Sequence, residues 1–323
     1  MKEQLEAILQ TATQAIRDSG AATDLEALRV KYLGKKGELT AVLKQMGKLA
    51  ADQRPAMGKM ANEVRAKLET ALTEQAAVLA EKAMEARLTL ETVDVTIPEG
   101  FTMQDIFRRL EENKVATYDA FLKAAAEYNF KYDFVESSSY AGAARLEGYL
   151  FPDTYQFYVN MEASSAINKL LNNFYLKYNA DMLSQTEKMG ITVKDVVSVA
   201  SIIEKEAKLD EDRPLVASVI YNRLVSGMSL GMDSTILYLY QDHNREPTAE
   251  MLADNSPYNT HLNPGLPPTP ICNPGLASIN AALNPSESNY YYFYADPESD
   301  KLNFFTTYEE FANYANTHPH TAS

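Results

Sequence analysis

The sequence predicts an α+β protein made of two unlike pieces. We expect an N-terminal α-helical hairpin of the coiled-coil kind over residues 1–92, then a mixed, mainly helical domain with a small β-hairpin. Residues 1–88 hold Tyr32 and no Phe, whereas the other 31 of the 32 Phe and Tyr residues lie beyond them. The same 88 residues carry 14 Lys and Arg with 12 Asp and Glu, a net of +2, which leaves −16 for the remainder. Aromatic content and charge therefore divide the chain at the same place.

The overall composition is that of a globular protein. Of the 323 residues, 46% are hydrophobic and 23% are charged, values that exclude a mostly disordered chain. No run of about 18 apolar residues occurs, so we expect no membrane segment. The opening MKEQLEAILQ does not fit a secretory signal peptide, so the chain as it stands is expected in the cytoplasm. One Cys and four scattered His predict neither a disulfide nor a zinc site, and no metal or cofactor is expected.

The first piece is predicted to form helices that fold back on one another. Leu5, Ile8, Leu9, Ala12 and Ile16 recur at helical spacing, and residues 56–88 form a second, long amphipathic stretch. The segment LGKKGELT and the pair Arg54-Pro55 break the chain between them, which predicts an antiparallel hairpin. Such a hairpin can be a purely structural coiled coil. Alternatively, Lys31, Lys35 and Lys36 around the turn can bind nucleic-acid phosphates.

Three features of this piece point to one family. The run from Leu28 to Thr40, the turn at Arg54-Pro55 and the triplet Asn62-Glu63-Val64 resemble the N-terminal arm of the alpha subunit of bacterial phenylalanyl-tRNA synthetase. The resemblance covers about residues 1–97 and implies an arm that contacts tRNA. The motifs of the synthetase catalytic domain do not follow, so no aminoacylation is expected.

The second piece begins with short mixed elements. Residues 93–97 alternate and are rich in β-branched side chains, which predicts a strand. Thr102 and Asp105 are spaced to cap a helix through Leu110, and a second helix is expected near 117–128. The aromatic segment 146–155 is expected to be a loop with short extended parts, and residues 163–187 to form one or two helices.

The next helix, over residues 192–209, carries the candidate acid. Its apolar residues run nearly all round, so it is expected to be buried, and Glu204 and Glu206 lie in its last turns. Residues two apart on a helix are rotated by about 200°, so the two carboxylates cannot share a face. A carboxyl group against apolar walls keeps its proton and suits a general acid. The alternative is that both pair with nearby bases, namely Lys205, Lys208, Arg213 or Arg223.

The C-terminal third predicts a cleft wall and a hairpin. A helix is expected from Pro214 to Gly227, then a loop through 233–238. Residues 255–275 contain six Pro, and this rigid loop is either a cleft wall or a surface connector, with Cys272 as a packing residue. A helix near 275–283, strands at 290–294 and 302–305 and a last helix capped by Thr307 follow. The chain has no Gly-rich phosphate loop, GxSxG, HExxH or CxxC motif.

Five ordered motifs of this piece resemble the endolytic murein transglycosylases, the YceG-like family, over about residues 93–323. They are VTIPEGFT from Val95, LEGYLFPDTY from Leu146, ASIIEKE from Ala200, RPLVASV with YNRL from Arg213, and YNT through NPG from Tyr258. The resemblance implies a partial LysM-like linking region over 93–160 and a catalytic domain over 161–323. It implies cleavage within peptidoglycan glycan strands to anhydro-muramyl ends, with Glu204 as acid and then base.

The same resemblance supplies candidate substrate-binding residues, which are Glu206, Asn222, Arg223, Asp233, Tyr258, Asn259 and Thr260. The usual membrane helix and the first part of the LysM-like region have no counterpart in this sequence, and the family acts outside the plasma membrane. Three functions therefore compete. The chain is a glycan-cleaving enzyme with a passive arm, a tRNA-binding hairpin with an inert appendage, or neither. The nearly complete catalytic region favours the enzyme.

Overall fold

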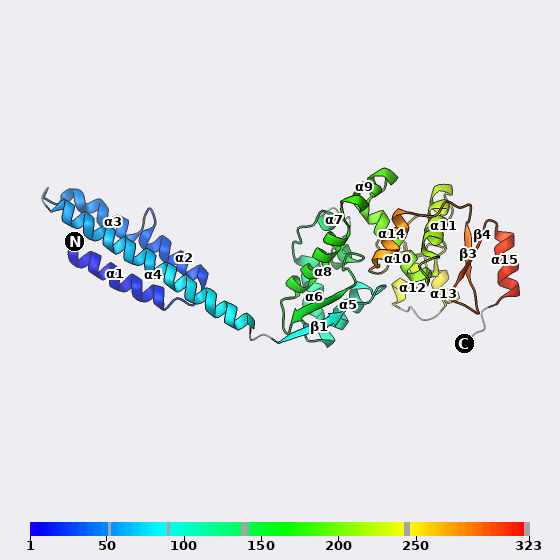
Figure 1. Cartoon of the computed structure of the whole chain (residues 1–323), viewed down its shortest axis with the longest axis horizontal. Helices are drawn as coiled ribbons and strands as arrows, with labels where there is room; N and C mark the ends of the chain where they lie inside the picture. Colours follow the sequence, from blue (N-terminus) through cyan, green and yellow to red (C-terminus); the bar gives the residue numbers. More distant parts are fainter. Residues whose placement is uncertain (51–52, 89–90, 137–139, 141, 242–245, 320–323) are drawn as a thin grey trace. The chain divides into compact units, whose positions relative to one another are not determined.

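The computed structural model describes residues 1–50, 53–88, 91–136, 140, 142–241 and 246–319 (Figure 1). Contacts divide the chain into two compact units, Met1–Leu90 and Glu91–Ser323. The fold class is α+β, since helices dominate and the strands form two small antiparallel pairs. Within the described ranges, no helix is long and apolar enough to cross a membrane.

The chain of the N-terminal unit runs in three successive helical segments, rather than the two of the expected hairpin. Helix α1 (Lys2–Arg17) leads into α2 (Ala22–Leu33), α3 (Glu38–Lys44) and the 3₁₀ turn η1 (Gln45–Lys48), and the long α4 (Arg54–Leu88) closes the unit. Figure 1 shows α1 and α4 running in the same direction, with α2 and α3 bringing the chain back. The additional segment arises because α1 ends just before Ser19-Gly20, so that α2 forms a separate helix running in the opposite direction.

A small aliphatic core holds this unit together. Its buried members are Leu5, Ala12, Ile16, Leu25, Tyr32, Leu39, Val42, Ala61, Val64 and Leu68. The amide of Gln75 on α4 donates hydrogen bonds to the carbonyls of Arg17 (3.2 Å) and Ser19 (3.0 Å). These bonds satisfy carbonyls at the end of α1 that have no partner within the helix.

The C-terminal unit opens with a two-stranded sheet flanked by helices. Strand β1 (Thr92–Thr96) pairs antiparallel with β2 (Thr154–Tyr158), with Thr92 opposite Tyr158. Between them lie α5 (Met103–Glu112), α6 (Tyr118–Glu127), α7 (Asp133–Glu136) and η2 (Gly142–Leu146). The capping box predicted at Thr102 and Asp105 is present. Strand β2 forms within and just beyond the segment expected to be a loop, because it gains its partner from a strand nearly 60 residues earlier.

The centre of this unit is α10 (Val193–Glu206), which the sequence predicted as a buried helix. All of its residues from Val196 to Ile203 are buried, and a capping box of Thr192 and Asp195 starts it. Helices α8 (Ala163–Lys177) and α9 (Ala180–Met189) precede it. Both α11 (Arg213–Ser226) and α14 (Leu276–Leu283) pack against it.

The expected loop at 233–238 is wrong, because these residues form helix α12 (Asp233–Tyr240). Its Thr235, Ile236 and Leu237 are buried, so packing rather than a capping signal stabilises it. A short α13 (Ala249–Leu252) follows. The predicted hairpin of β3 (Tyr292–Ala295) and β4 (Leu302–Phe305) is present, with α15 (Tyr308–Thr317) behind it.

Gly148 lies where the chain passes α10 at close range. Its φ is +90°, and a Cβ there would lie 2.6 Å from Pro270 Cγ and 2.7 Å from Val197 Cγ1. We predict that Gly148→Ala lowers the free energy of unfolding by about 3 kcal/mol, from backbone strain together with overpacking. Gly190 also has a positive φ, +69°, but open space around it. Gly190→Ala should therefore cost about 1 kcal/mol. Urea unfolding followed by tyrosine fluorescence measures both, and equal losses would contradict the close contact.

Candidate active site

Glu204, the sequence candidate for the acid, lies in a buried ion pair. Its Oε2 is 3.2 Å from Arg213 Nη1 on α11, and the side chains of the two residues are only 7% and 9% exposed. The backbone N–H of Gly275, at the start of α14, donates to the same oxygen over 2.9 Å. This is the ion-pair alternative that the sequence left open. Through these contacts Glu204 joins α10, α11 and the start of α14.

Glu99 lies on the other side of this pair. Its carboxyl group fills the space where a Cβ at Gly275 would be, 1.8 Å from Oε1. Burial, and then the nearby negative charge of Glu204, raises the pKa of Glu99, while Arg213 acts in the opposite direction. The arginine therefore faces Glu204 and Glu99, and its Nε also pairs with Asp210 Oδ1 over 3.0 Å. A side chain at Gly275 would have to displace the Glu99 carboxyl group.

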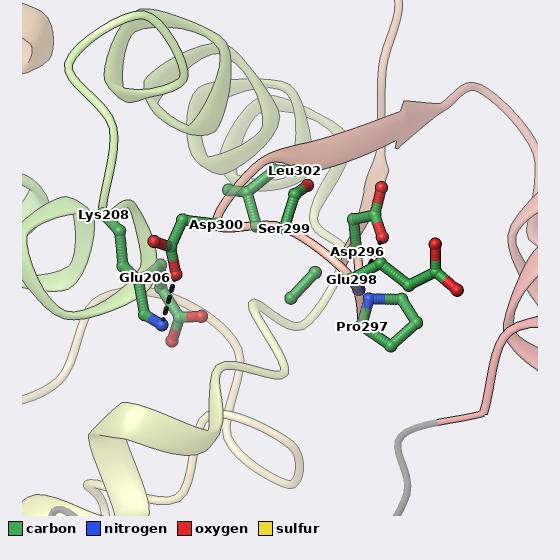
Figure 2. A pocket seen from close by; sticks show the side chains of 9 residues that line it. Glu206, Lys208, Asp296, Pro297, Glu298, Ser299, Asp300 and Leu302 are labelled. Carbon is green, nitrogen blue, oxygen red and sulfur yellow. Dashed lines mark hydrogen bonds and ion pairs between the residues drawn. The ribbon is translucent and has the colours of Figure 1, made fainter.

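Glu206 has a different environment. It lines an open pocket of about 460 Å³ together with Lys208 and the β3–β4 turn (Figure 2). The hydroxyl of Ser234 donates to Glu206 Oε1 over 2.6 Å. Burial is the main reason that the pKa of Glu206 is raised, and the negative charge of Asp233 adds to it. The Ser234 hydrogen bond and His261 act in the opposite direction. Glu206 thus combines access to a pocket with a tendency to keep its proton.

Two ion pairs fasten the β3–β4 turn beside Glu206. Lys208 Nζ lies 2.8 Å from Asp300 Oδ1, and Lys301 Nζ lies 3.0 Å from Glu211 Oε1. The backbone N–H of Leu302 donates to Asp212 Oδ2 over 3.0 Å. The turn therefore forms a wall of the pocket, bound to the α10–α11 connection (Figure 2).

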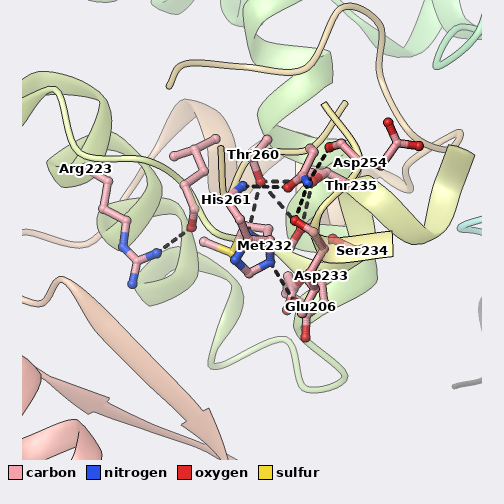
Figure 3. Close-up of polar contacts among 12 residues, drawn as sticks. Glu206, Arg223, Met232, Asp233, Ser234, Thr235, Asp254, Thr260 and His261 are labelled. Atoms are coloured by element: carbon pink, nitrogen blue, oxygen red, sulfur yellow. Dashed lines mark hydrogen bonds and ion pairs between the residues drawn. The ribbon is translucent and has the colours of Figure 1, made fainter. Parts of the chain in front are cut away.

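A second polar cluster adjoins Glu206 on its other side (Figure 3). His261 Nε2 lies 2.8 Å from Asp233 Oδ1, and their side chains are 33% and 54% exposed. Thr260 is buried, accepts the backbone N–H of Met232 over 3.0 Å and lies 2.9 Å from the Thr235 hydroxyl. Thr260 therefore holds the loop of His261 to the start of α12.

The remaining predicted binding residues bond mainly to the protein itself. Asn222 donates to the carbonyls of Ser288 and Tyr290, and Arg223 donates to those of Tyr291 and Leu230. Asn259 is fully buried and donates to the carbonyls of Leu252 and Asp254. The Tyr258 hydroxyl lies 2.8 Å from that of Thr269. In this structure their polar groups shape the loops around the site, and their binding of sugars stays a prediction.

Ser234 and His261 were not singled out from the sequence. Each directly follows a predicted residue, Asp233 and Thr260, and that adjacency was the available signal. Cys272 is buried as expected, and its thiol donates to the carbonyl of Ser201. Across the described ranges, no three His, Cys, Asp or Glu side chains gather as metal ligands.

The comparisons with known proteins agree with both resemblances. The YceG-like family matches residues 43–317, so the chain belongs to that family. The endolytic murein transglycosylase of Bacillus subtilis (strain 168) is 41% identical over 154 residues, 46% of this chain and 42% of that protein. The phenylalanine–tRNA ligase alpha subunit of Exiguobacterium sibiricum is 45% identical over 98 residues, 30% of this chain and 29% of that protein. The chain thus spans less than half the length of each.

A solved structure supports the fold. The crystal structure of a putative YceG-like protein of Listeria monocytogenes superimposes with a TM-score of 0.63 at 32% identity. The alignment covers 74% of this chain and 81% of the other. The likeness therefore extends over most of both chains.

A buried carboxyl group away from the pocket, Glu147, links the elements that carry the site. It accepts hydrogen bonds from Met103 N–H (2.9 Å), Asn273 Nδ2 (3.0 Å) and the Tyr238 hydroxyl (3.0 Å). Burial, only partly offset by the bonds from Met103 and Tyr238, raises the pKa of Glu147 to about 7. The Asn273 backbone in turn bonds Phe101 and Gly100. Glu147 therefore joins α5, α12 and the loop before α14.

The raised pKa of Glu147 predicts a loss of stability as pH rises. The folded state binds this proton more tightly than the unfolded chain, so the contribution is complete below about pH 4.5 and is lost by about pH 7. Between pH 5 and 7.5 it should cost about 2 kcal/mol. Urea unfolding at the two pH values should show that Glu147→Gln removes this difference. The exposed control Glu136→Gln should keep it, and a Glu147→Gln difference equal to that of the wild type would contradict the assignment.

Proposed function

We propose that this chain cleaves peptidoglycan glycan strands by lytic transglycosylation, with Glu206 as the acid and then the base. The single observation that carries the proposal is the position of Glu206, a carboxyl group with a raised pKa that lines an open pocket of about 460 Å³. Membership in the YceG-like family and the name of the Bacillus subtilis relative support the substrate class.

The structure favours Glu206 over Glu204 for this role. A proton donor must hold a proton and reach the substrate. Glu204 is nearly inaccessible, and its Oε2 is occupied by Arg213 and by the Gly275 N–H. Glu206 faces the pocket. Burial is the largest cause of its raised pKa, and it favours the protonated form. We therefore propose Glu206 as the acid in place of Glu204, the residue that the resemblance implies.

The chemistry needs one carboxyl group. Protonated Glu206 donates to the glycosidic oxygen while the bond breaks through an oxocarbenium-like state. The resulting carboxylate accepts the proton of the muramyl sugar's own primary hydroxyl, whose oxygen bonds to the anomeric carbon. The product is a 1,6-anhydro-muramyl end, no water is consumed, and Glu206 regains its proton. Ser234, which donates to Oε1, orients the carboxyl group through both steps.

Digestion of purified peptidoglycan tests the assignment. We predict anhydro-muramyl products from the wild-type chain and a loss of at least about 100-fold in Glu206→Gln, the usual contribution of a general acid. Glu204→Gln should lower the free energy of unfolding by about 3 kcal/mol, because it removes the buried charged partner of Arg213 and leaves only the exposed Asp210 paired with it. While it is folded, that variant should lose less activity than Glu206→Gln, because it removes a support of the acid and not the acid itself. Product mass spectrometry provides the readout.

The matched control is Glu250→Gln, at an exposed position on α13. It should behave as the wild type in both activity and stability. Full activity in Glu206→Gln, with none in a folded Glu204→Gln, would return the acid to Glu204. Reducing-end products without an anhydro ring would replace transglycosylation by hydrolysis.

A second candidate function concerns the N-terminal unit. We propose that its antiparallel α2 and α4 act as an arm that binds tRNA, as the name of the Exiguobacterium sibiricum relative suggests. Lys31, Lys35 and Lys36 are exposed at the end of α2 and in the turn that follows. Lys31 lies over the Tyr32 ring at 4.9 Å and is 3.9 Å from Glu38, a distance too long for a strong pair. The Lys31 and Glu38 side chains are both exposed, so a phosphate can replace Glu38 at the ammonium group.

Changing these three lysines to alanine together should weaken tRNA binding and its dependence on salt. The slope of log K against log salt should become shallower by about two to three, because each phosphate contact contributes about 0.9. Filter binding over a range of salt concentrations measures it. The control replaces Lys2, Lys44 and Lys59, which are exposed in the same unit, and removes the same charge. Equal effects in the two variants would mean non-specific attraction only.

A further inference from the structure

The start of α12 places a charge pair directly beside Glu206. Ser234 donates to Glu206 Oε1 over 2.6 Å, and the preceding residue, Asp233, lies 2.8 Å from His261 Nε2. Figure 3 shows Glu206, Asp233 and His261 together at one edge of this cluster. A separate contact between the Thr235 and Thr260 hydroxyls also holds the start of α12.

Other charged groups also lie around Glu206. They are Lys208, Arg223, Asp296, Glu298 and Asp300, from the α10–α11 connection, α11 and the β3–β4 turn. Lys208 pairs with Asp300, and Arg223 bonds two carbonyls and lies over the Tyr292 ring. Histidine is the side-chain type whose charge ordinarily changes between pH 5 and 8. His261 is the one histidine among the groups named here around Glu206.

We propose that Asp233 and His261 form a tuning pair that sets the pH range over which Glu206 keeps its proton. The carboxylate of Asp233 favours the protonated form of Glu206, because two like charges disfavour each other. Protonated His261 cancels that effect. The two members of the pair therefore act on the pKa of Glu206 in opposite directions. Neither residue touches the reacting atoms, so both are positioning residues for Glu206.

This proposal rests on the proposed function for its use in catalysis, but the effect on Glu206 is a property of the free protein. Direct titration therefore comes first. The full chain is labelled with ¹³Cδ-glutamate, and the Glu206 signal is identified by its absence in Glu206→Gln. We expect Asp233→Asn to lower the pKa of Glu206 and His261→Gln to raise it, each by about half a unit, the scale for partly exposed charges. The glutamine keeps an N–H for Asp233, so the loop contact survives.

The control is His318→Gln, at the exposed end of α15, which should leave the Glu206 titration unchanged. Melting curves identify any variant that is unfolded, and His261→Asn and Asp233→Ser then replace it. Shifts of opposite sign support the pair. Shifts of the same sign, shifts below about 0.2 units, or an equal shift in His318→Gln overturn it.

The pH profile of glycan cleavage provides the second readout. The alkaline limb of this profile should shift in the same direction as the pKa of Glu206. It should move to lower pH in Asp233→Asn and to higher pH in His261→Gln, a displacement that a purely structural defect does not produce. If the wild-type chain yields no anhydro products, the proposed function fails while the titration still decides the pair. If the titration shifts and the limb stays, Glu206 is not the acid in turnover and the tuning role is overturned.

Discussion

The buried contact of Glu204 with Arg213 and the Gly275 N–H is the constraint on which the active-site geometry depends. It joins the last turn of α10, the first turn of α11 and the first residue before α14 at one oxygen atom. Because it fixes the end of α10, it also fixes the direction of Glu206 two residues later. A general acid works only when it is held near its productive geometry, and a buried neighbouring residue on the same helix provides that support.

Such a contact is costly to bury, so its presence needs a reason other than stability. Desolvation of two charges commonly offsets their attraction, whereas removal of one partner leaves an uncompensated buried charge. Here the pair selects one arrangement of three elements, since the carboxylate of Glu204 can be satisfied only when Arg213 and Gly275 are both in place. Glu99 adds to this specificity, because its carboxyl group occupies the space beside Gly275. The two acids of the motif therefore divide two tasks, and Glu204 positions while Glu206 faces the pocket.

The sequence predicted best those features whose determining residues lie close together along the chain. The capping boxes at Thr102, Thr192 and Thr307 each involve residues within a span of four, and all three are present in the structure. Strand β2 and helix α12 were missed because distant partners stabilise them, namely β1 and the buried layer around Thr260. The same limit applied to the acids. Spacing showed that Glu204 and Glu206 must face different environments, but only the folded chain shows which one meets Arg213 and which one meets Ser234.

The two resemblances in this chain correspond to two hydrophobic cores. The buried residues of the first run from Leu5 to Leu68 and include one aromatic side chain, whereas those of the second begin at Val95 and contain most of the buried aromatic residues. A core of small aliphatic side chains suits packed helices, but it offers little to line a cleft, while stacked rings and irregular loops can enclose one. The division that composition made visible in the sequence is therefore a division of physical roles. The N-terminal unit presents an exposed helical surface with bases at its turn, and the C-terminal unit builds a pocket beside Glu206, a carboxyl group whose pKa is raised by burial.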